Sequence, residues 1–186
     1  NEIAAASEEG HSRMPSPGHV ERGLDELWTN ARQVIRACIE KAEIQPEEIA
    51  AIGCAGHGNG LYALDRDGAP LIGIQSLDTR AAGLVDEWRE AGVGDRTYPI
   101  ARQRPWPSQT PTLLAWLKRH RPDLFNRIGT VFFSKDFVVN RLTGQRVSEV
   151  SDMSGAGLLD LAARRYDKAL MEAYGLDDCM DLLPPL

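Results

Sequence analysis

The sequence predicts one domain of the mixed α/β class. Three observations support this: short β-prone apolar runs alternate with segments of helical periodicity, two apolar runs separated by glycines lie near the centre, and 42% of the residues are hydrophobic. The 186 residues have the size of one ordinary domain, with enough apolar material for a core. We find no internal repeat and no low-complexity segment.

A long helix is the first expected element. Residues 1–19 contain Pro15, Pro17 and Gly18 and indicate a loop. From Val20 to about Ala42, apolar residues recur at helical spacing and form one stripe. We expect this helix to pack its apolar stripe on a sheet.

The predicted fold is organised around an apolar run, Ile49–Ala55. Five residues that include three glycines follow it. Such a run, closed by glycines, predicts a fully buried strand that forms a hairpin with the next run, Leu61–Leu64. The glycines at its carboxyl end would present His57 and Asn59 where open α/β sheets bind ligands. Two interpretations stay open: a small polar ligand held by these side chains, or a tight turn that needs only glycine.

A turn and a third strand follow. Residues 65–68 have turn chemistry with Gly68 at the tip, and residues 70–76 form the next β-prone run. Asp78 then precedes a helix expected from Ala81 to Arg89. A carboxylate accepts hydrogen bonds and suits a polyol hydroxyl, but Asp78 could equally cap the helix or pair with Arg80.

The segment from Gly92 to Gln109 is predicted to be an irregular polar loop. It carries several donors around Trp106, as functional loops often do. The alternative is a surface loop that Trp106 merely anchors.

The rest of the chain continues the alternation of helices and strands. The expected elements, in order, are a helix over 111–120, a helical turn over 122–125, a strand over 130–133, a helix over 134–142 ended by Gly144, a polar segment over 147–154, and a last helix spaced by Tyr166, Leu170 and Tyr174 and ended by Gly175.

Composition narrows the function classes. A net charge of −6 argues against a nucleic-acid surface, and no apolar stretch approaches the roughly 20 residues that span a bilayer. The three cysteines are far apart and odd in number, which gives neither a disulfide framework nor a metal-binding spacing. We therefore expect a cytoplasmic protein with no nucleic-acid or membrane partner.

Five sequence segments in order are similar to the amino-terminal half of the FGGY family of carbohydrate kinases, from its xylulokinase branch. The segments are Pro17–Arg22 leading to Trp28, Gly53–Asn59, Gln75–Arg80, Ser134–Asp136 with Arg141–Gly144, and Ser151–Gly157. No single one is decisive, but five at plausible intervals are specific. The string from His57 to Tyr62, with Arg104–Pro107, most resembles the L-xylulose kinase subgroup.

This resemblance implies a ribonuclease-H-like domain of the actin-like ATPase fold, in an enzyme that phosphorylates a sugar. Residues 1–186 would be a partial N-terminal, sugar-binding domain that lacks the family's first phosphate hairpin. The ATP-binding domain and the general-base Asp would lie beyond residue 186, so no catalytic, nucleotide-binding or metal-binding residue is assigned inside this chain.

The resemblance also implies site residues and partners. By position, Gly58 and Asn59 match the family's sugar-contacting pair, and Asp78 matches a carboxylate near the sugar. With His57 and Trp106 these form the expected substrate-binding set. The implied substrate is a ketopentose, the cofactors are ATP and Mg²⁺, and a homodimer is the oligomer to consider.

Two rival hypotheses remain beside a pentulose kinase. The first is a sensor or degenerate kinase that keeps the sugar pocket but not catalysis. The second is an assembly protein of the actin-like class that binds no sugar, against which the polar residues His57 and Asn59 argue.

Overall fold

The computed structural model describes residues 2–186. Its helices, in chain order, are α1 (Leu24–Ala42), α2 (Ala82–Glu90), α3 (Val93–Ala101), α4 (Thr110–His120), α5 (Pro122–Phe125), α6 (Ser134–Thr143), α7 (Val150–Gly155) and α8 (Lys168–Ala173). The strands are β1 (Leu61–Asp65), β2 (Pro70–Ile74), β3 (Ile128–Phe132), β4 (Leu159–Asp160) and β5 (Arg165–Tyr166), and two 3₁₀ turns are η1 (Pro46–Glu48) and η2 (Met180–Leu182).

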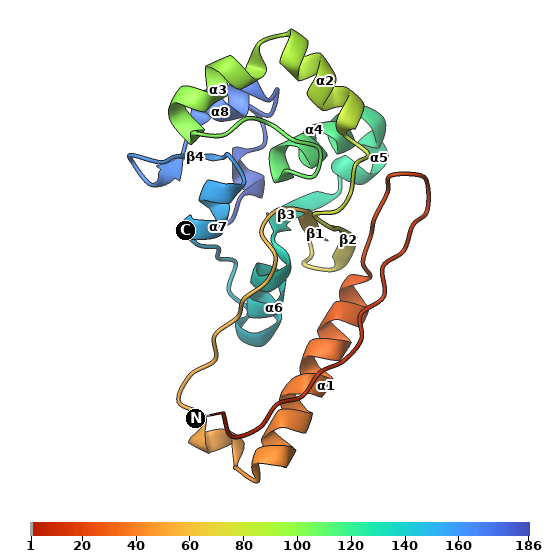
Figure 1. The fold of residues 1–186 in the computed structure, drawn as a ribbon, viewed down its shortest axis with the longest axis vertical. Coiled ribbons are helices and arrows are strands. Elements are labelled where there is room, and N and C mark those ends of the chain that lie inside the picture. Colours follow the sequence, from red (N-terminus) through yellow and green to blue (C-terminus); the bar gives the residue numbers. More distant parts are fainter. Residues whose placement is uncertain (1) are drawn as a thin grey trace.

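A three-stranded antiparallel sheet of order β2-β1-β3 lies at the centre (Figure 1). The turn between β1 and β2 forms as predicted, because Asp65 Oδ1 accepts from the backbone N–H of Asp67 and of Ala69, and Gly68 supplies φ of 80°. A second, two-stranded sheet joins β4 to β5. The central sheet and its flanking helices confirm the mixed α/β class.

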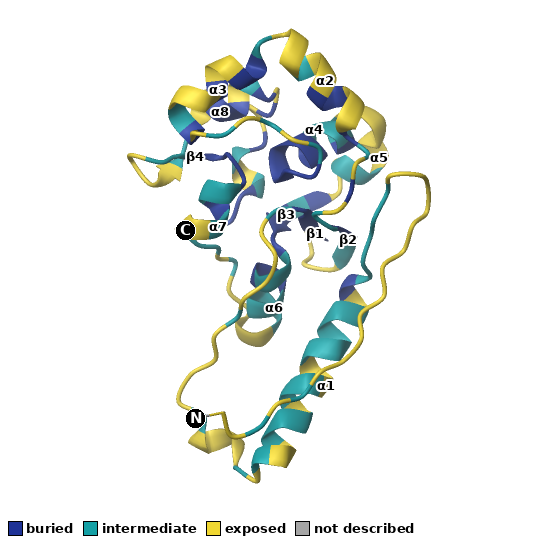
Figure 2. Ribbon diagram, viewed as in Figure 1, coloured by how far each residue is buried: buried dark blue, intermediate teal, exposed yellow. Residues whose placement is uncertain are grey.

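Alternate residues of β1 enter two different cores. Leu61 and Ala63 pack into a large cluster with α4, whereas Tyr62 and Leu64 pack with residues of α1 and α6. Because both faces of the strand are covered, β1 is a continuous apolar run rather than an alternating one. Figure 2 shows that burial is concentrated in β1, β3 and α4, while α1 is only half-buried.

The predicted strand over Ile49–Ala55 is wrong in this structure, and so is its hairpin with Leu61–Leu64. Residues 49–60 form an extended connection without strand pairing, and most of them are exposed. Apolar composition favours a strand, but a strand also needs a neighbour to complete its backbone hydrogen bonds. Among residues 2–186, none lies in register beside this segment.

Two helices were not predicted. Helix α3 occupies half of the segment expected to be an irregular loop, and α7 covers the second half of the polar segment 147–154 and ends one residue beyond it. Pro99 inside α3 and the short length of α7 hide their helical pattern in the sequence. Both helices matter because they frame the polar groups described next.

Candidate functional site

The glycine-rich segment 56–60 passes between the start of α6 and α7 before entering β1. A Cβ atom on Gly56 would come 2.8 Å from Ser134 Oγ, and one on Gly58 would come 3.6 Å from Asp152 Oδ1. The first distance is too short for a real contact, so the absence of a side chain lets the loop approach α6. The loop therefore lies against both helices.

Asn59 is the residue of this loop whose side chain turns into the protein. Its φ is 64°, a left-handed conformation that asparagine tolerates better than most residues. Its Nδ2 donates to the carbonyl of Gly155 at the end of α7, at 3.4 Å. Its Oδ1 is buried and has no hydrogen-bond partner within the described part of the chain.

Two glutamines extend this polar arrangement. Gln109, fully buried just before α4, donates from Nε2 to Gln103 Oε1 at 3.1 Å, and Gln103 donates from its own Nε2 to the carbonyl of Ser154. Like Asn59 Oδ1, Gln109 Oε1 is a buried acceptor without a partner among residues 2–186. Sequence reasoning assigned neither glutamine, because glutamines in a polar loop match no motif.

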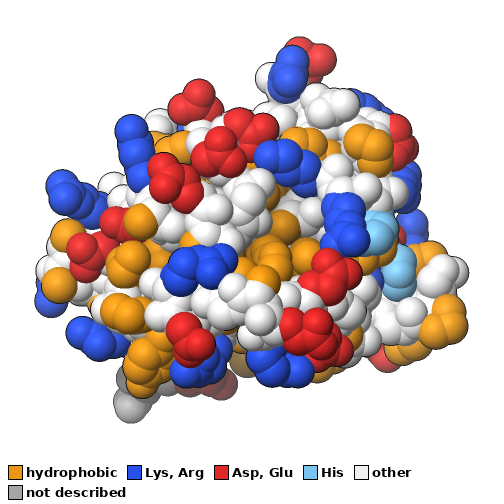
Figure 3. Space-filling view, turned by 90° about the horizontal axis from the view of Figure 1, so that it is seen from above, with side chains coloured by type: hydrophobic (Ala, Val, Ile, Leu, Met, Phe, Trp, Pro, Cys, Tyr) orange, Lys and Arg blue, Asp and Glu red, His pale blue; other side chains and the backbone are white. Residues whose placement is uncertain are grey.

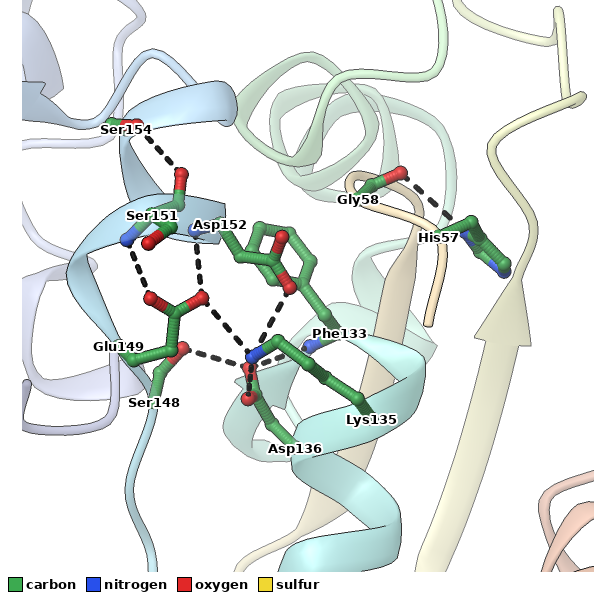
Figure 4. A network of polar contacts seen from close by, with 10 residues as sticks. All are labelled: His57, Gly58, Phe133, Lys135, Asp136, Ser148, Glu149, Ser151, Asp152 and Ser154. Atoms are coloured by element: carbon green, nitrogen blue, oxygen red, sulfur yellow. Dashed lines mark hydrogen bonds and ion pairs between the residues drawn. The ribbon is translucent and has the colours of Figure 1, made fainter. Parts of the chain in front are cut away.

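A lysine surrounded by carboxylates lies beside the same loop (Figure 4). Lys135 Nζ is 2.6 Å from Asp136 Oδ1, 3.1 Å from Asp152 Oδ2 and 3.4 Å from Glu149 Oε1. The lysine and Asp136 belong to α6, whereas Asp152 belongs to α7 and Glu149 is the residue that caps it. A cavity of about 320 Å³ adjoins the cluster and is lined by Lys135, Asp136 and Glu149 among others.

The charges in this cluster stabilise one another. Burial disfavours the charged form of Lys135, but hydrogen bonds to Asp136 and Asp152 outweigh burial and raise the pKa of the lysine. Burial likewise acts against ionised Glu149, but the N–H groups of Asp152 and Ser151 lower the pKa of its carboxyl. Lys135 and Glu149 are therefore both charged at neutral pH.

His57 points away from this cluster in Figure 4. It is exposed, and its Nε2 is hydrogen-bonded to the hydroxyl of Tyr62 at 3.0 Å. Burial raises the pKa of Tyr62 to about 12, so the phenol stays neutral at physiological pH. The structure therefore places Gly58 and Asn59 together near α7 but turns the His57 ring elsewhere.

The other two predicted residues lie outside this arrangement. The carboxylate of Asp78 is buried and accepts four hydrogen bonds, one from the backbone N–H of Val20 and three from Arg80. These contacts fill its acceptor sites and give it a structural role, as the alternative interpretation had it. Trp106 is 37% exposed, and its carbonyl accepts from the N–H of Gln109. A sugar contact of either residue stays a prediction.

The residues present do not form a metal site. Within residues 2–186, no group of three or more His, Cys, Asp or Glu side chains is arranged to hold a metal ion. Lys135 already occupies the space between the three carboxylates of its cluster. No step involving Mg²⁺ can therefore be derived from this chain.

The decisive comparison is with known protein families. The sequence model that describes the N-terminal domain of the FGGY family of carbohydrate kinases matches residues 1–186 of this chain. This chain belongs to the FGGY family. The resemblance found in the sequence is thus confirmed, and with it the actin-like ATPase class of the fold.

Relatives of this FGGY domain are named as sugar kinases. The chain is 38% identical over 170 residues to a probable L-xylulose kinase of Pasteurella multocida, and 36% identical over 173 residues to the L-xylulose/3-keto-L-gulonate kinase of Escherichia coli. These matches cover 91% and 92% of the chain but 35% of each relative. The FGGY domain thus spans about a third of the length of the curated relatives it matches.

A solved structure supports the same fold. A xylulose kinase from Rhodospirillum rubrum superposes with a TM-score of 0.83 at 26% identity, over 94% of this chain and 36% of that one.

As for membranes, none of the helices in the described part of the FGGY domain has the length and apolar character needed to cross one. On the face in Figure 3, basic and acidic side chains are interspersed without a continuous basic surface.

Proposed function

We propose that the protein to which this FGGY domain belongs transfers a phosphoryl group from ATP to a ketopentose, with L-xylulose preferred. Residues 1–186 would supply the sugar-binding half, as part of the N-terminal domain, and the remainder would supply the ATP-binding domain. Support comes from the family match and from two relatives, above 35% identity, that are named L-xylulose kinases. The cysteine pattern supports a cytoplasmic location.

The observation that carries the proposal concerns two of the buried oxygens that have no hydrogen-bond partner among the described residues, Asn59 Oδ1 and Gln109 Oε1, which belong to one polar network. Leaving a buried oxygen unsatisfied costs about 1–3 kcal/mol, so such atoms are rare unless a ligand completes them. A sugar offers hydroxyl groups that donate hydrogen bonds. Asn59 and Gln109 are linked through α7, since the carbonyls of Gly155 and Ser154 orient Asn59 and Gln103.

These acceptors explain how the domain would choose its substrate. A site built to receive a hydroxyl rejects an analogue that lacks it, because the protein group is then left unpaired. Phosphoryl transfer itself depends on positioning and on charge stabilisation by Mg²⁺ and cationic groups. We assign ATP, Mg²⁺ and the base that accepts the sugar proton to the rest of the protein.

The test is a substrate panel with the complete protein. ATP-dependent phosphorylation should be measured for D- and L-xylulose, D- and L-ribulose, 3-keto-L-gulonate and glycerol, and we expect the highest kcat/KM with L-xylulose. Activity confined to glycerol would overturn the ketopentose assignment. Sugar binding in calorimetry with no turnover on any substrate would instead identify a sugar-binding module without catalysis.

A further inference from the structure

Lys135 connects two helices that have no other charged link. Its ammonium group contacts Asp136 on its own helix α6, Asp152 on α7, and Glu149, the residue that caps α7. Its side chain is only 11% exposed and that of Asp136 only 4%, so solvent screens the pair with Asp136 weakly, whereas Glu149 is 45% exposed and its pair with Lys135 is screened more. One cation is thus shared by three carboxylates, and in the described part of the chain no other cation pairs with any of them.

Helix α7 is too short to be stable by itself and depends on the buried side chain of Met153 and on polar contacts for its position. It has six residues, and isolated helices of this length are not stable in water. Glu149 caps it by accepting from the N–H groups of Ser151 and Asp152, and that same carboxylate lies 3.4 Å from Lys135. Lys135 therefore contacts both the cap and the first turn of α7.

The other end of α7 holds the acceptors of the candidate sugar site. The carbonyl of Gly155 receives the Asn59 amide, and the carbonyl of Ser154 receives the Gln103 amide. The loop that carries Asn59 also passes over Lys135, since a Cβ atom on Gly56 would lie 3.4 Å from the Lys135 backbone nitrogen. A displacement of α7 would thus move the partners of both amides.

We propose that Lys135 is a positioning residue: it fixes α7 against α6 and so orients the Asn59 amide directly, and the Gln109 amide through Gln103, toward the sugar. Its effect on sugar binding rests on the proposed function, whereas its effect on α7 does not. Without Lys135, three carboxylates from two elements would face one another without a cation. Their repulsion would push α7 away from α6.

The experiment uses the complete protein with Lys135→Met and the charge-preserving Lys135→Arg. The matched control is Lys118→Met, which removes a different lysine that pairs with Asp178 and bonds the carbonyl of Gly175, between α4 and the segment after α8. Asp152→Asn serves as a milder second variant if Lys135→Met fails to fold. The two readouts are steady-state kinetics and hydrogen exchange of the peptide covering residues 150–157.

For Lys135→Met we expect the sugar KM to rise on the order of 10- to 100-fold, because a small misplacement of binding groups has effects of this size. The ATP KM should stay unchanged. Exchange of residues 150–157 should accelerate, Lys135→Arg should restore much of both properties, and Asp152→Asn should show the same changes to a smaller degree. Lys118→Met should change neither.

Three results would overturn the inference. One is hydrogen exchange of α7 at the wild-type rate in Lys135→Met. If Lys135→Met does not fold, the same result in Asp152→Asn counts instead. Another is a rise of the ATP KM equal to that of the sugar KM. The third is the same response in the Lys118→Met control. If the wild-type protein phosphorylates no sugar but exchange at α7 still responds to Lys135, the positioning role stands and the proposed function fails.

Discussion

Asn59 combines two properties that a generic loop residue does not need. Its backbone is left-handed, with φ of 64°, and its side-chain oxygen is buried without a partner in the part of the chain described. The backbone requirement alone would be met by glycine, which flanks Asn59 on both sides. An asparagine at this position is therefore explained by its amide rather than by its conformation.

The residue-scale prediction separates these two properties. Asn59→Gly keeps the left-handed backbone without strain and removes only the amide, whereas Asn59→Ala would also strain the chain by roughly 1 kcal/mol. We expect Asn59→Gly to lower kcat/KM for the sugar by about 10-fold, the equivalent of one neutral hydrogen bond of about 1.4 kcal/mol, with an unchanged thermal midpoint.

The control for this prediction is Asn140→Ala. Asn140 also donates from Nδ2 to a backbone carbonyl, that of Gln145, but it lies at the exposed end of α6. Its loss should leave the kinetics unaltered. If Asn59→Gly and Asn140→Ala behave alike in the kinetic assay, Asn59 belongs to the structure of the loop and not to the sugar site.

Sequence reasoning located part of this site for a physical reason. Glycines on both sides of a polar residue mark a backbone that approaches something closely, which singled out Asn59. Gln103 and Gln109 gave no such signal, because a glutamine amide serves a site only through partners distant in sequence. For Gln103 that partner is the carbonyl of Ser154, 51 residues away.

At the scale of elements, glycine has opposite consequences in two helices. Gly144 ends α6 in a left-handed conformation, with φ of 72°, and its N–H donates to the carbonyl of Asn140. Gly83 lies within α2 and needs no positive φ. A Cβ atom would meet nothing within 4 Å at either position, so only the backbone distinguishes them.

This contrast predicts shifts of opposite sign in stability. Gly83→Ala should stabilise the protein by about 0.5–1 kcal/mol, because alanine loses less backbone entropy in a helix. Gly144→Ala should destabilise it by about 1–2 kcal/mol, because alanine disfavours the left-handed region. Thermal unfolding of the complete protein measures both, and a lower midpoint for Gly83→Ala would contradict the assigned backbone roles.

Element prediction succeeded where the signal was local and failed where it was not. The stripe of α1, the turn at Gly68 and the glycine that ends α6 depend on neighbouring residues and were found. The segment Ile49–Ala55 has strand composition, but its backbone finds no neighbour among the described residues. Helix α3 was missed because Pro99 conceals it, although burial of Thr97 and Ala101 holds it in place.

At the scale of the whole molecule, the C-terminal part of α1 extends away from the central sheet, as Figure 1 shows, whereas its first turns pack on β1 and β3. Its apolar side lines two cavities of about 440 and 380 Å³, and Ile35 of α1 and Ile52 of the extended segment contribute to both. Clustered apolar side chains on a surface are a common feature of contacts with other protein. Since the chain spans about a third of its relatives, we expect further chain of the complete protein to cover them.

This expectation leads to a prediction about two exposed apolar residues. Ile52 is 56% exposed and Leu77 is 75% exposed in the 186-residue chain, so by exposure alone a lysine should be tolerated at both. If the cavities beside Ile52 are covered in the complete protein, Ile52→Lys buries an unpaired charge and should cost about 3–5 kcal/mol. Leu77 lines neither cavity, so Leu77→Lys should stay within about 0.5 kcal/mol of the wild type. Thermal unfolding of the complete protein compares the midpoints of Ile52→Lys and Leu77→Lys. Equal midpoints would mean that the apolar side of α1 faces solvent in the complete protein too.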